Sequence, residues 1–332
     1  MAKGWLRALR DAPELRGRVQ LVGFVDLNLD AAKALQAEFG RADAVSDTDL
    51  AAVLSTAKPE LVFDVVVPSA RHDVVMTALS GGCHLLTEKP MAVSLEDARA
   101  QIAAATAGGR VYAVVQNRRF VNGVRRIRET LASGVLGDLT ALHADFFIGA
   151  HFGGFREQME HVLLLDMAIH TFDTARFISR ADAVAVYCLE TNPLDSWYRH
   201  GAAANAIFEF SNDIVFTYRG SWAAEGGATS WESRWRVIGT AGTLLWDGAE
   251  NFEAQIVSGE SGFLRPLRDV AVPLPPHPEQ TLGHASVIAD FLDAVETGRA
   301  PETSGADNIK SLAMVLGAIE SATTHRRVLI EA

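Results

Sequence analysis

The sequence is poor in cysteine and has no long apolar run. Cys83 and Cys188 are the only cysteines among 332 residues, which excludes a disulfide scaffold and a cysteine-built metal site and predicts a reducing, cytoplasmic location. No apolar stretch approaches the roughly 18 residues that a membrane helix needs, and the N-terminus lacks the apolar region of a signal peptide. The sequence therefore predicts a soluble protein that has no membrane partner.

Positive charge is also scarce, with 30 Lys and Arg against 41 Asp and Glu and a formal net charge of -11. A field of this sign repels phosphate backbones and anionic lipid headgroups, so we expect no nucleic-acid partner. Hydrophobic residues at 48% and charged residues at 21% are typical of a folded globular protein. At roughly 100 to 200 residues per domain, the length predicts two domains.

The first part of the chain alternates short apolar runs with helical patterns, which is typical of parallel βαβ units. The expected strands cover residues 19–26, 61–68, 84–90 and 110–117, and the expected helices cover 29–39, 47–54, 72–80 and 95–107. A basic amphipathic stretch, residues 2–12, precedes them and is typical of a buried first helix or of a transit peptide. We predict an α/β fold whose N-terminal domain, residues 1–118, is a Rossmann-like dinucleotide-binding domain with a parallel sheet.

After about residue 120 strands follow one another with few helices between them. A helix over 121–133 is followed by a β-hairpin whose turn lies at 211–213 and by further strands at 232–239 and 243–247. Two long helical patterns, 282–296 and 306–324, are expected to cover one face of this sheet, and the Pro-rich segment 273–280 is expected to be a linker. The pattern of strands and helices over residues 119–332 therefore predicts an α+β substrate-binding and oligomerisation domain with a mostly antiparallel sheet.

The opening of the first domain departs from the usual pattern, in which a strand and a glycine-rich turn precede the first helix. Asp26 ends the first expected strand, and the acidic residue that binds a ribose lies about 20 residues after the glycine fingerprint. The fingerprint would then straddle Met1, and the missing strand would leave two central neighbours with unpaired edges. We expect that Met1 is an internal methionine of a longer reading frame; the alternative is a variant domain with a displaced first strand.

Lys89, in the tripeptide Glu88-Lys89-Pro90, lies where a parallel strand is expected to end. Open α/β sheets bind their ligands at that edge. A lysine there can donate a hydrogen bond to a substrate oxygen and polarise it, and partial desolvation favours proton transfer. The alternative is a solvated loop lysine.

Asp166, His170 and Asp173 are spaced at i, i+4 and i+7, so one helix would carry them as a single polar stripe. The rest of that helix is apolar on nearly every side, which predicts burial. A buried carboxylate and imidazole one turn apart form a proton-transfer set when a substrate hydroxyl is the third partner. A structural Asp-His pair that caps neighbouring backbone is the alternative.

Taken together, these residues resemble the Gfo/Idh/MocA oxidoreductases over nearly the whole chain. The matching residues, in chain order, are Asp26 at a strand end, Pro68 with His72, Glu88-Lys89-Pro90, Gln116-Asn117-Arg118-Arg119-Phe120, Gly134 with Leu136-Gly137, and Asp166 with His170. The resemblance implies that Lys89, Asp166 and His170 lie around the nicotinamide and the reacting carbon. It assigns His170 as general base or acid, Asp166 as its orienting or substrate-binding partner, and Lys89 as the group that polarises the oxygen.

The remaining site residues divide between cofactor and substrate. We expect cofactor contacts from Asp26, Pro68, His72, Glu88, Lys89 and Gln116, and substrate contacts from Asn117, Arg118, His151, Asp166 and His170. Arg118 and His151 are included because of their position after a strand end. A carboxylate such as Asp26 accepts hydrogen bonds from a ribose diol and repels a 2'-phosphate. NAD is therefore the expected cofactor and NADP the alternative, with Arg41 as a cation that could fold back.

We therefore expect an NAD-dependent dehydrogenase that acts on a secondary hydroxyl or ketone of a sugar, inositol or related polyol, and that forms a homodimer or homotetramer. The alternatives are an NAD-dependent glycosidase of the same fold and a non-catalytic nucleotide or sugar sensor. The histidines at 143, 151, 161 and 170 show no metal-binding pattern, so no metal is expected. The tryptophans at 222, 231, 235 and 246 are expected in the core or a subunit interface rather than stacked on a sugar.

Overall fold

The computed structural model describes residues 2–332, which form two compact units. The first unit contains the chain up to residue 117 together with residues 282–309, and the second contains 118–281 and 310–332. The change of domain therefore falls next to the expected residue 118. The sequence indicates one division of the chain, at residue 118. The structure differs from this, because residues 282–309 return to the N-terminal unit.

The first unit alternates strands and helices. Its strands are β1 (Gly23–Val25), β2 (Val45–Asp47), β3 (Leu61–Asp64), β4 (His84–Thr87) and β5 (Tyr112–Val114). Its helices are α1 (Ala2–Asp11), α2 (Leu29–Phe39), α3 (Leu50–Ala57), α4 (Pro68–Ser80), α5 (Leu95–Ala107) and α8 (His284–Thr297). All strand pairs within it are parallel, as expected for a Rossmann-like domain.

Clear capping signals set the ends of two of these helices. The side chain of Asn28 accepts hydrogen bonds from the backbone at the start of α2, and Gly40 follows its last residue. Ser94 caps α5 in the same way through the backbone N–H of Asp97, and Gly108 ends it. Because such caps satisfy the free N–H groups of the first turn, both helices have the bounds that the sequence predicts.

The parallel sheet of the first unit is divided into two parts, β1-β2 and β3-β4-β5. In a doubly wound domain the six positions of the sheet have the order 3-2-1-4-5-6. Here β2 and β1 correspond to positions 3 and 2, and β3, β4 and β5 to positions 4, 5 and 6, so the division falls at position 1. Within residues 2–332, β1 therefore pairs only with β2, and β3 only with β4. One edge of β1 and one edge of β3 therefore have no strand partner within residues 2–332.

The second unit is built on one large sheet of nine strands in the order β13-β12-β11-β10-β6-β9-β8-β7-β14. These strands are β6 (Leu139–Phe147), β7 (Ala183–Thr191), β8 (Ala203–Phe210), β9 (Val215–Ser221), β10 (Arg234–Gly239), β11 (Gly242–Trp246), β12 (Phe252–Val257), β13 (Leu267–Asp269) and β14 (Val328–Leu329). Every pair is antiparallel except β6 with β9, so the sheet is mixed, as the α+β prediction allows.

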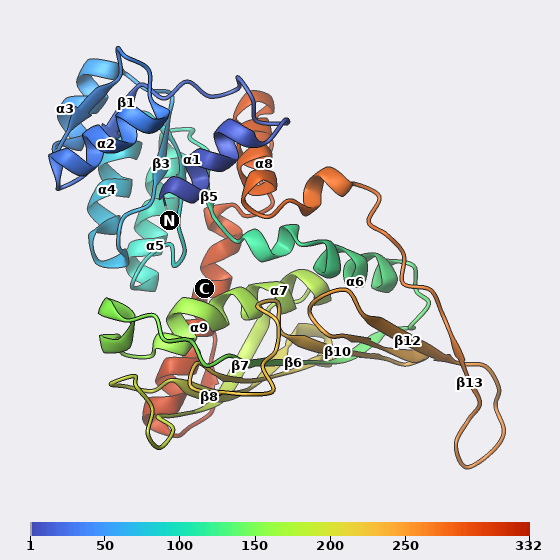
Figure 1. The fold of residues 1–332 in the computed structure, drawn as a ribbon. Coiled ribbons are helices and arrows are strands. Elements are labelled where there is room, and N and C mark those ends of the chain that lie inside the picture. Colours follow the sequence, from blue (N-terminus) through green and yellow to red (C-terminus); the bar gives the residue numbers. More distant parts are fainter. Residues whose placement is uncertain (1) are drawn as a thin grey trace. The chain divides into compact units, whose positions relative to one another are not determined.

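Helices cover one face of the large sheet. Figure 1 shows α6 (Asn122–Ala132) and α7 (Ile169–Ser179) running along it, and α9 (Gly305–Thr324) adds Met314, Val315 and Ala318 to the same core. Five short helical turns complete the chain: η1 (Asn117–Phe120), η2 (Gly154–Gln158), η3 (Leu163–Ala168), η4 (Ser211–Asp213) and η5 (Pro278–Thr281).

Aromatic side chains fill the space between the helices and the sheet. Phe172 of α7 packs edge to face on Phe208 and Tyr218, at centroid distances of 4.7 Å and 5.2 Å. Three of the four tryptophans singled out in the sequence belong to this core, at positions 222, 235 and 246, whereas Trp231 is 47% exposed.

Several features differ from the sequence prediction, among them the start of α4 at Pro68 rather than at residue 72 and the shorter strand β1. The helix α8 was expected on the antiparallel sheet, but it belongs to the first unit, where it contacts α1 and β4. The strand β2 was missed, and the following helix begins at Leu50 rather than at residue 47. Among residues 2–332, no helix is both long and apolar enough to cross a bilayer.

Candidate functional site

In the first unit, the candidate residues follow two neighbouring strands. Glu88 and Lys89 come directly after β4, and Gln116 comes two residues after β5. The backbone N–H of Val115 donates to the carbonyl oxygen of Thr87, so the pairing of the two strands continues to this edge. The expected position of Lys89, at the carboxyl edge of a parallel sheet, is thus where the structure has it, and its side chain is half-buried.

Glu88 is buried and engaged on both oxygens. Its Oε1 accepts a hydrogen bond of 2.8 Å from Trp5 Nε1, and its Oε2 accepts one of 3.2 Å from the backbone N–H of Lys89. Trp5 belongs to α1 and is 2% exposed. This contact could not be predicted, because the two residues are 83 positions apart in the chain. Glu88 therefore fixes the backbone that carries Lys89.

A buried ion pair fixes the turn on the other side of Lys89. Arg71 of α4 donates from Nε to Asp64 at 3.0 Å, and from Nη1 to the carbonyl oxygen of Pro90 at 2.5 Å. Thr87 also donates its hydroxyl proton to Asp64. Arg71 and Asp64 are almost fully buried, so removing either would leave a buried charge uncompensated. Arg71 was not identified from the sequence, although it lies between Pro68 and His72.

Pro68 and His72 occupy the first turns of α4, the end that faces the carboxyl edge of the sheet. Pro68 is the first residue of the helix, where a missing N–H has no cost. His72 Nδ1 lies 3.3 Å from Asp97 Oδ1 of α5, and its side chain is 37% exposed.

Two residues of the first unit fit a dinucleotide cofactor. Asp26 is exposed directly after β1 and uses Oδ1 to accept from the backbone of Asn28, which leaves the other oxygen for a ribose diol. The side-chain amide of Gln116 is fully buried, and neither of its polar atoms has a hydrogen-bond partner within residues 2–332. A buried amide without partners is costly, so this group is suited to bind a polar ligand. The expected glycine fingerprint straddles Met1, which lies outside the described residues; Ala2 and Gly4 belong to α1.

In the second unit, Asp166 lies in a π-helical segment, η3, which continues directly into α7. Such segments are rare and are frequently found at functional sites. Asp166 Oδ2 accepts a hydrogen bond of 3.0 Å from Arg156 Nε, and its side chain is 16% exposed. His170 is the second residue of α7 and is half-buried, so the structure brings both expected residues to consecutive turns of one helical segment.

Asp173 does not share their surroundings, so the single polar stripe expected from the spacing is wrong. Asp173 is fully buried and accepts from Arg119 Nε and Nη2 at 2.7 Å and 2.6 Å, and from the Ser311 hydroxyl at 2.7 Å. Asp173 lies within the regular helix α7, and its burial against Arg119 and Ser311 involves distant segments that the spacing does not reveal. Asp173 and Arg119 therefore form a structural ion pair in the core.

The other expected substrate residues lie on different elements. Asn117 belongs to the first unit, where its Nδ2 lies 3.3 Å from His284 Nδ1. Arg118 forms an ion pair with Glu232, and burial lowers its pKa to about 10, so it stays charged at neutral pH. His151 is exposed, and its ring stacks on Trp197 at a centroid distance of 3.7 Å.

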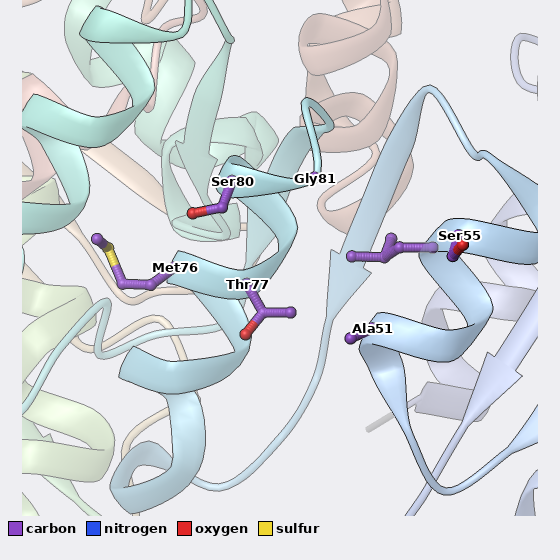
Figure 2. Close-up of a pocket in the computed structure, with 7 residues that line it drawn as sticks. Ala51, Ser55, Met76, Thr77, Ser80 and Gly81 are labelled. Atoms are coloured by element: carbon purple, nitrogen blue, oxygen red, sulfur yellow. The ribbon is translucent and has the colours of Figure 1, made fainter.

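One pocket of the first unit lies away from the candidate residues of that unit. It has a volume of about 590 Å³ and lies between α3 and α4 (Figure 2), where its lining residues are Ala51, Leu54, Ser55, Met76, Thr77, Ser80 and Gly81. This lining has no titratable side chain, and it lies toward the C-terminal end of α4, opposite Pro68. Among residues 2–332, no group of three or more His, Cys, Asp or Glu side chains is arranged to hold a metal ion.

Comparison with known proteins identifies the two parts of the chain. Residues 2–116 match a family model described as an oxidoreductase family with an NAD-binding Rossmann fold, and residues 124–245 match the GFO/IDH/MocA C-terminal domain. A solved oxidoreductase from Agrobacterium radiobacter, in complex with NAD+, L-tartaric acid and magnesium, has the same fold with a TM-score of 0.84. The two chains are 21% identical, and the match covers 99% of this chain and 95% of the Agrobacterium radiobacter chain.

Two curated proteins are similar in sequence. The 1,5-anhydro-D-fructose reductase of Ensifer adhaerens is 25% identical over 86% of this chain and 82% of its own length. The D-glucoside 3-dehydrogenase of Escherichia coli is 31% identical over 51% of this chain and 49% of its own length. Since the two family models together span most of the chain and the fold agrees, the protein belongs to the GFO/IDH/MocA family of NAD-binding oxidoreductases.

Proposed function

We propose that the protein oxidises a secondary hydroxyl group of a sugar, inositol or related polyol with NAD, or catalyses the reverse reduction. The similar curated proteins, an anhydrofructose reductase and a glucoside dehydrogenase, support a carbohydrate-like substrate. The observation that carries the proposal is the placement of three residues that can supply acid-base chemistry. Lys89 follows β4 at the carboxyl edge of the parallel sheet, while Asp166 and His170 lie on one helical segment of the second unit.

Lys89 is the residue that we assign to the reacting oxygen. Its ammonium group donates a hydrogen bond to the substrate oxygen and stabilises the negative charge that develops there when the hydroxyl proton leaves. Glu88, which binds the backbone N–H of Lys89, and Arg71, which binds the carbonyl oxygen of Pro90, act as positioning residues for this lysine.

His170 is the residue that we assign to proton transfer. In the oxidative direction its imidazole takes the hydroxyl proton, and in the reductive direction the imidazolium returns it. Asp166 orients the imidazole or the substrate hydroxyl, and Arg156 holds the Asp166 carboxylate through Nε. Asn117, Arg118 and His151 are proposed substrate contacts.

Asp26 would hold a ribose of NAD, and the side-chain amide of Gln116 would bind a polar group of the same cofactor. Pro68 and His72, at the start of α4, are the other proposed cofactor contacts. Bound NAD supplies the acceptor for the hydride that leaves the carbinol carbon. The chain's own contribution is to bind and orient the two reactants and to move the proton.

The test is a screen of polyols and sugars with NAD, followed by the absorbance of NADH. For the best substrate, Lys89→Ala and His170→Ala should each lower kcat by about 100-fold to 10,000-fold, the usual contribution of a positioned acid or base. Lys33→Ala and His277→Ala change the same residue types at exposed positions and should leave kcat unchanged.

The outcomes separate the proposed roles. Near-normal turnover in either site variant would remove that residue from the mechanism. Release of an aglycone without net NADH would indicate a glycosidase, and NAD binding without turnover of any substrate would indicate a sensor.

A homodimer is the assembly that we propose, formed through the face of the large sheet that the helices of the second unit leave open. Tyr187, Ile207 and Thr217 pair across β7, β8 and β9 on that face, and Leu189 lies beside them. The side chains of Tyr187, Leu189 and Ile207 are each more than two-fifths exposed, which is typical of an interface rather than of a solvated surface. An aspartate at Ile207 should convert the assembly to a monomer, as measured by light scattering after size exclusion.

The proposed location is the cytoplasm. Cys83 and Cys188 are buried, and no disulfide joins them. Two free thiols in a chain of this size fit a reducing compartment.

A further inference from the structure

Arg156 donates a hydrogen bond to the proposed catalytic carboxylate of Asp166, and this contact was not predicted from the sequence. Arg156 lies in η2, in the segment that leads into the π-helical turn of Asp166. Its guanidinium lies over the rings of Phe152 and Phe155, at 5.1 Å and 5.0 Å from their centroids. Its side chain is 30% exposed, so the charge reaches solvent at the site.

The turn that carries Arg156 is fixed by its own hydrogen bonds. Glu157 accepts from the backbone N–H of Gly153 at 2.8 Å through Oε1, and from the backbone N–H of Arg199 at 2.9 Å through its carbonyl oxygen. The carbonyl oxygen of Arg156 itself accepts from Met159. The guanidinium is therefore held in place before any substrate binds, which lowers the entropy cost of recognition.

The ion pair with Asp166 differs from the purely structural pairs of the chain. Arg119 donates hydrogen bonds to Asp173 from both Nε and Nη2. Arg219 donates to Asp145 from the same two atoms. Arg156 donates to Asp166 only from Nε, and its two terminal nitrogens have no acceptor within residues 2–332. The outer edge of this guanidinium, with its N–H groups, therefore remains available to an external oxyanion.

We propose that Arg156 binds a carboxylate of the substrate, so that the preferred substrates are sugar or polyol acids rather than neutral polyols. This rests on the proposed function, because it names the substrate class for the same site. A guanidinium presents parallel N–H groups that match the two oxygens of a carboxylate. Arg156 also neutralises Asp166, which would otherwise repel an acidic substrate.

Matched substrate pairs test this assignment. Each neutral compound is compared with the acid that has a carboxylate in place of a terminal hydroxymethyl group: glucose with glucuronate, galactose with galacturonate, and xylitol with xylonate. We expect the parent protein to prefer the acid of the best pair by at least about tenfold in kcat/KM, the value of one charge-assisted contact. Arg156→Gln should raise KM for that acid by about tenfold to 100-fold and change KM for its neutral partner by less than about threefold.

Two further variants separate recognition from structure. Arg156→Lys keeps the positive charge but loses the parallel N–H groups of the guanidinium. Its KM for the acid should therefore lie between those of the parent and Arg156→Gln. Arg265→Gln makes the same charge change at an exposed residue of the second unit and should leave both KM values unchanged.

The inference is overturned if the parent prefers the neutral member of every pair. It is also overturned if Arg156→Gln changes KM equally for acid and neutral substrates, because Arg156 would then act only through Asp166. If no compound yields NADH, the proposed function fails, and calorimetric binding of the acids to parent and Arg156→Gln still decides the assignment. Equal acid affinity of the two proteins would refute it.

Discussion

Two aspartates seven residues apart on one helical segment should respond in opposite ways to the same substitution. Asp173 is fully buried and accepts two hydrogen bonds from Arg119 and one from Ser311. Asp173→Asn keeps the volume but leaves the guanidinium of Arg119, which is 4% exposed, without its counter-charge. Breaking a buried pair of this kind costs about 3–5 kcal/mol in the free energy of unfolding.

Asp166→Asn is the matched variant. Asp166 and Arg156 are partly exposed and share one hydrogen bond, so the loss of this pair should cost at most about 1 kcal/mol. The same change should lower kcat by about 100-fold or more, because Asp166 is proposed to orient the group that transfers the proton. Asp173→Asn should leave kcat within about threefold at temperatures where it is folded.

Thermal and urea unfolding followed by tryptophan fluorescence measures the first effect, since three tryptophans are buried in the core of the second unit. At about 2–4 °C per kcal/mol for a unit of this size, Asp173→Asn should lower Tm by about 6–20 °C. The reasoning would be refuted if Asp166→Asn were the more destabilised variant, or if Asp173→Asn lost activity at unchanged stability.

Three other expectations concern the cofactor, a pH-dependent pair and the thiols. Asp26→Ser should lower the ratio of NAD to NADP affinity by about tenfold, measured by titration with each cofactor, since the carboxylate no longer repels a 2'-phosphate; an unchanged ratio would remove Asp26 from this role. The hydrogen bond that His161 Nδ1 donates to Glu190 raises the pKa of His161, so the stability from this pair is fully present below about pH 6.5 and is lost as the pH rises through the raised pKa. His161→Asn should flatten that part of the profile of unfolding free energy against pH, and an identical slope in both proteins would contradict the assignment. Burial raises the pKa of Cys188 to about 12, so this thiol should react with a disulfide reagent only after unfolding, and rapid labelling of the native protein would show that it is exposed.

Elements with local end signals could be predicted from the sequence. The bounds of α2 and α5 follow from Asn28 with Gly40 and from Ser94 with Gly108, because caps and breakers act within one turn. The placement of Lys89 also follows locally, since an apolar strand ends just before it. The strand β2 was missed because three residues, with no apolar alternation, carry no periodic signal.

Contacts between distant segments could not be predicted in this way. The apolar stripe of α8 shows that it packs on something, but not that its partners are α1 and β4 rather than the large sheet. The burial of Asp173 involves distant segments, so the spacing of Asp166, His170 and Asp173 alone indicated one shared face. Arg156 lies ten residues before Asp166 in an irregular segment, where periodicity gives no information on direction.

The division of the parallel sheet also bears on how the cofactor residues are held. Asp26 follows β1 and Gln116 follows β5, so the two belong to sheets that share no backbone hydrogen bond within residues 2–332. In an undivided sheet, strand pairing would fix their separation.

Here α1 supplies part of that connection. On one side Trp5 donates to Glu88 and packs edge to face on Phe63 of β3 at 5.8 Å; on the other side Lys3 pairs with Glu38 of α2 at 2.6 Å. The contact with Glu88 is buried, but the ion pair with α2 is exposed, and such pairs contribute at most about 1 kcal/mol. The β1-β2 half, which carries Asp26, is therefore tied to α1 more weakly than the half that carries Lys89. The geometry at the ribose end of the cofactor site accordingly depends on helix packing rather than on strand register.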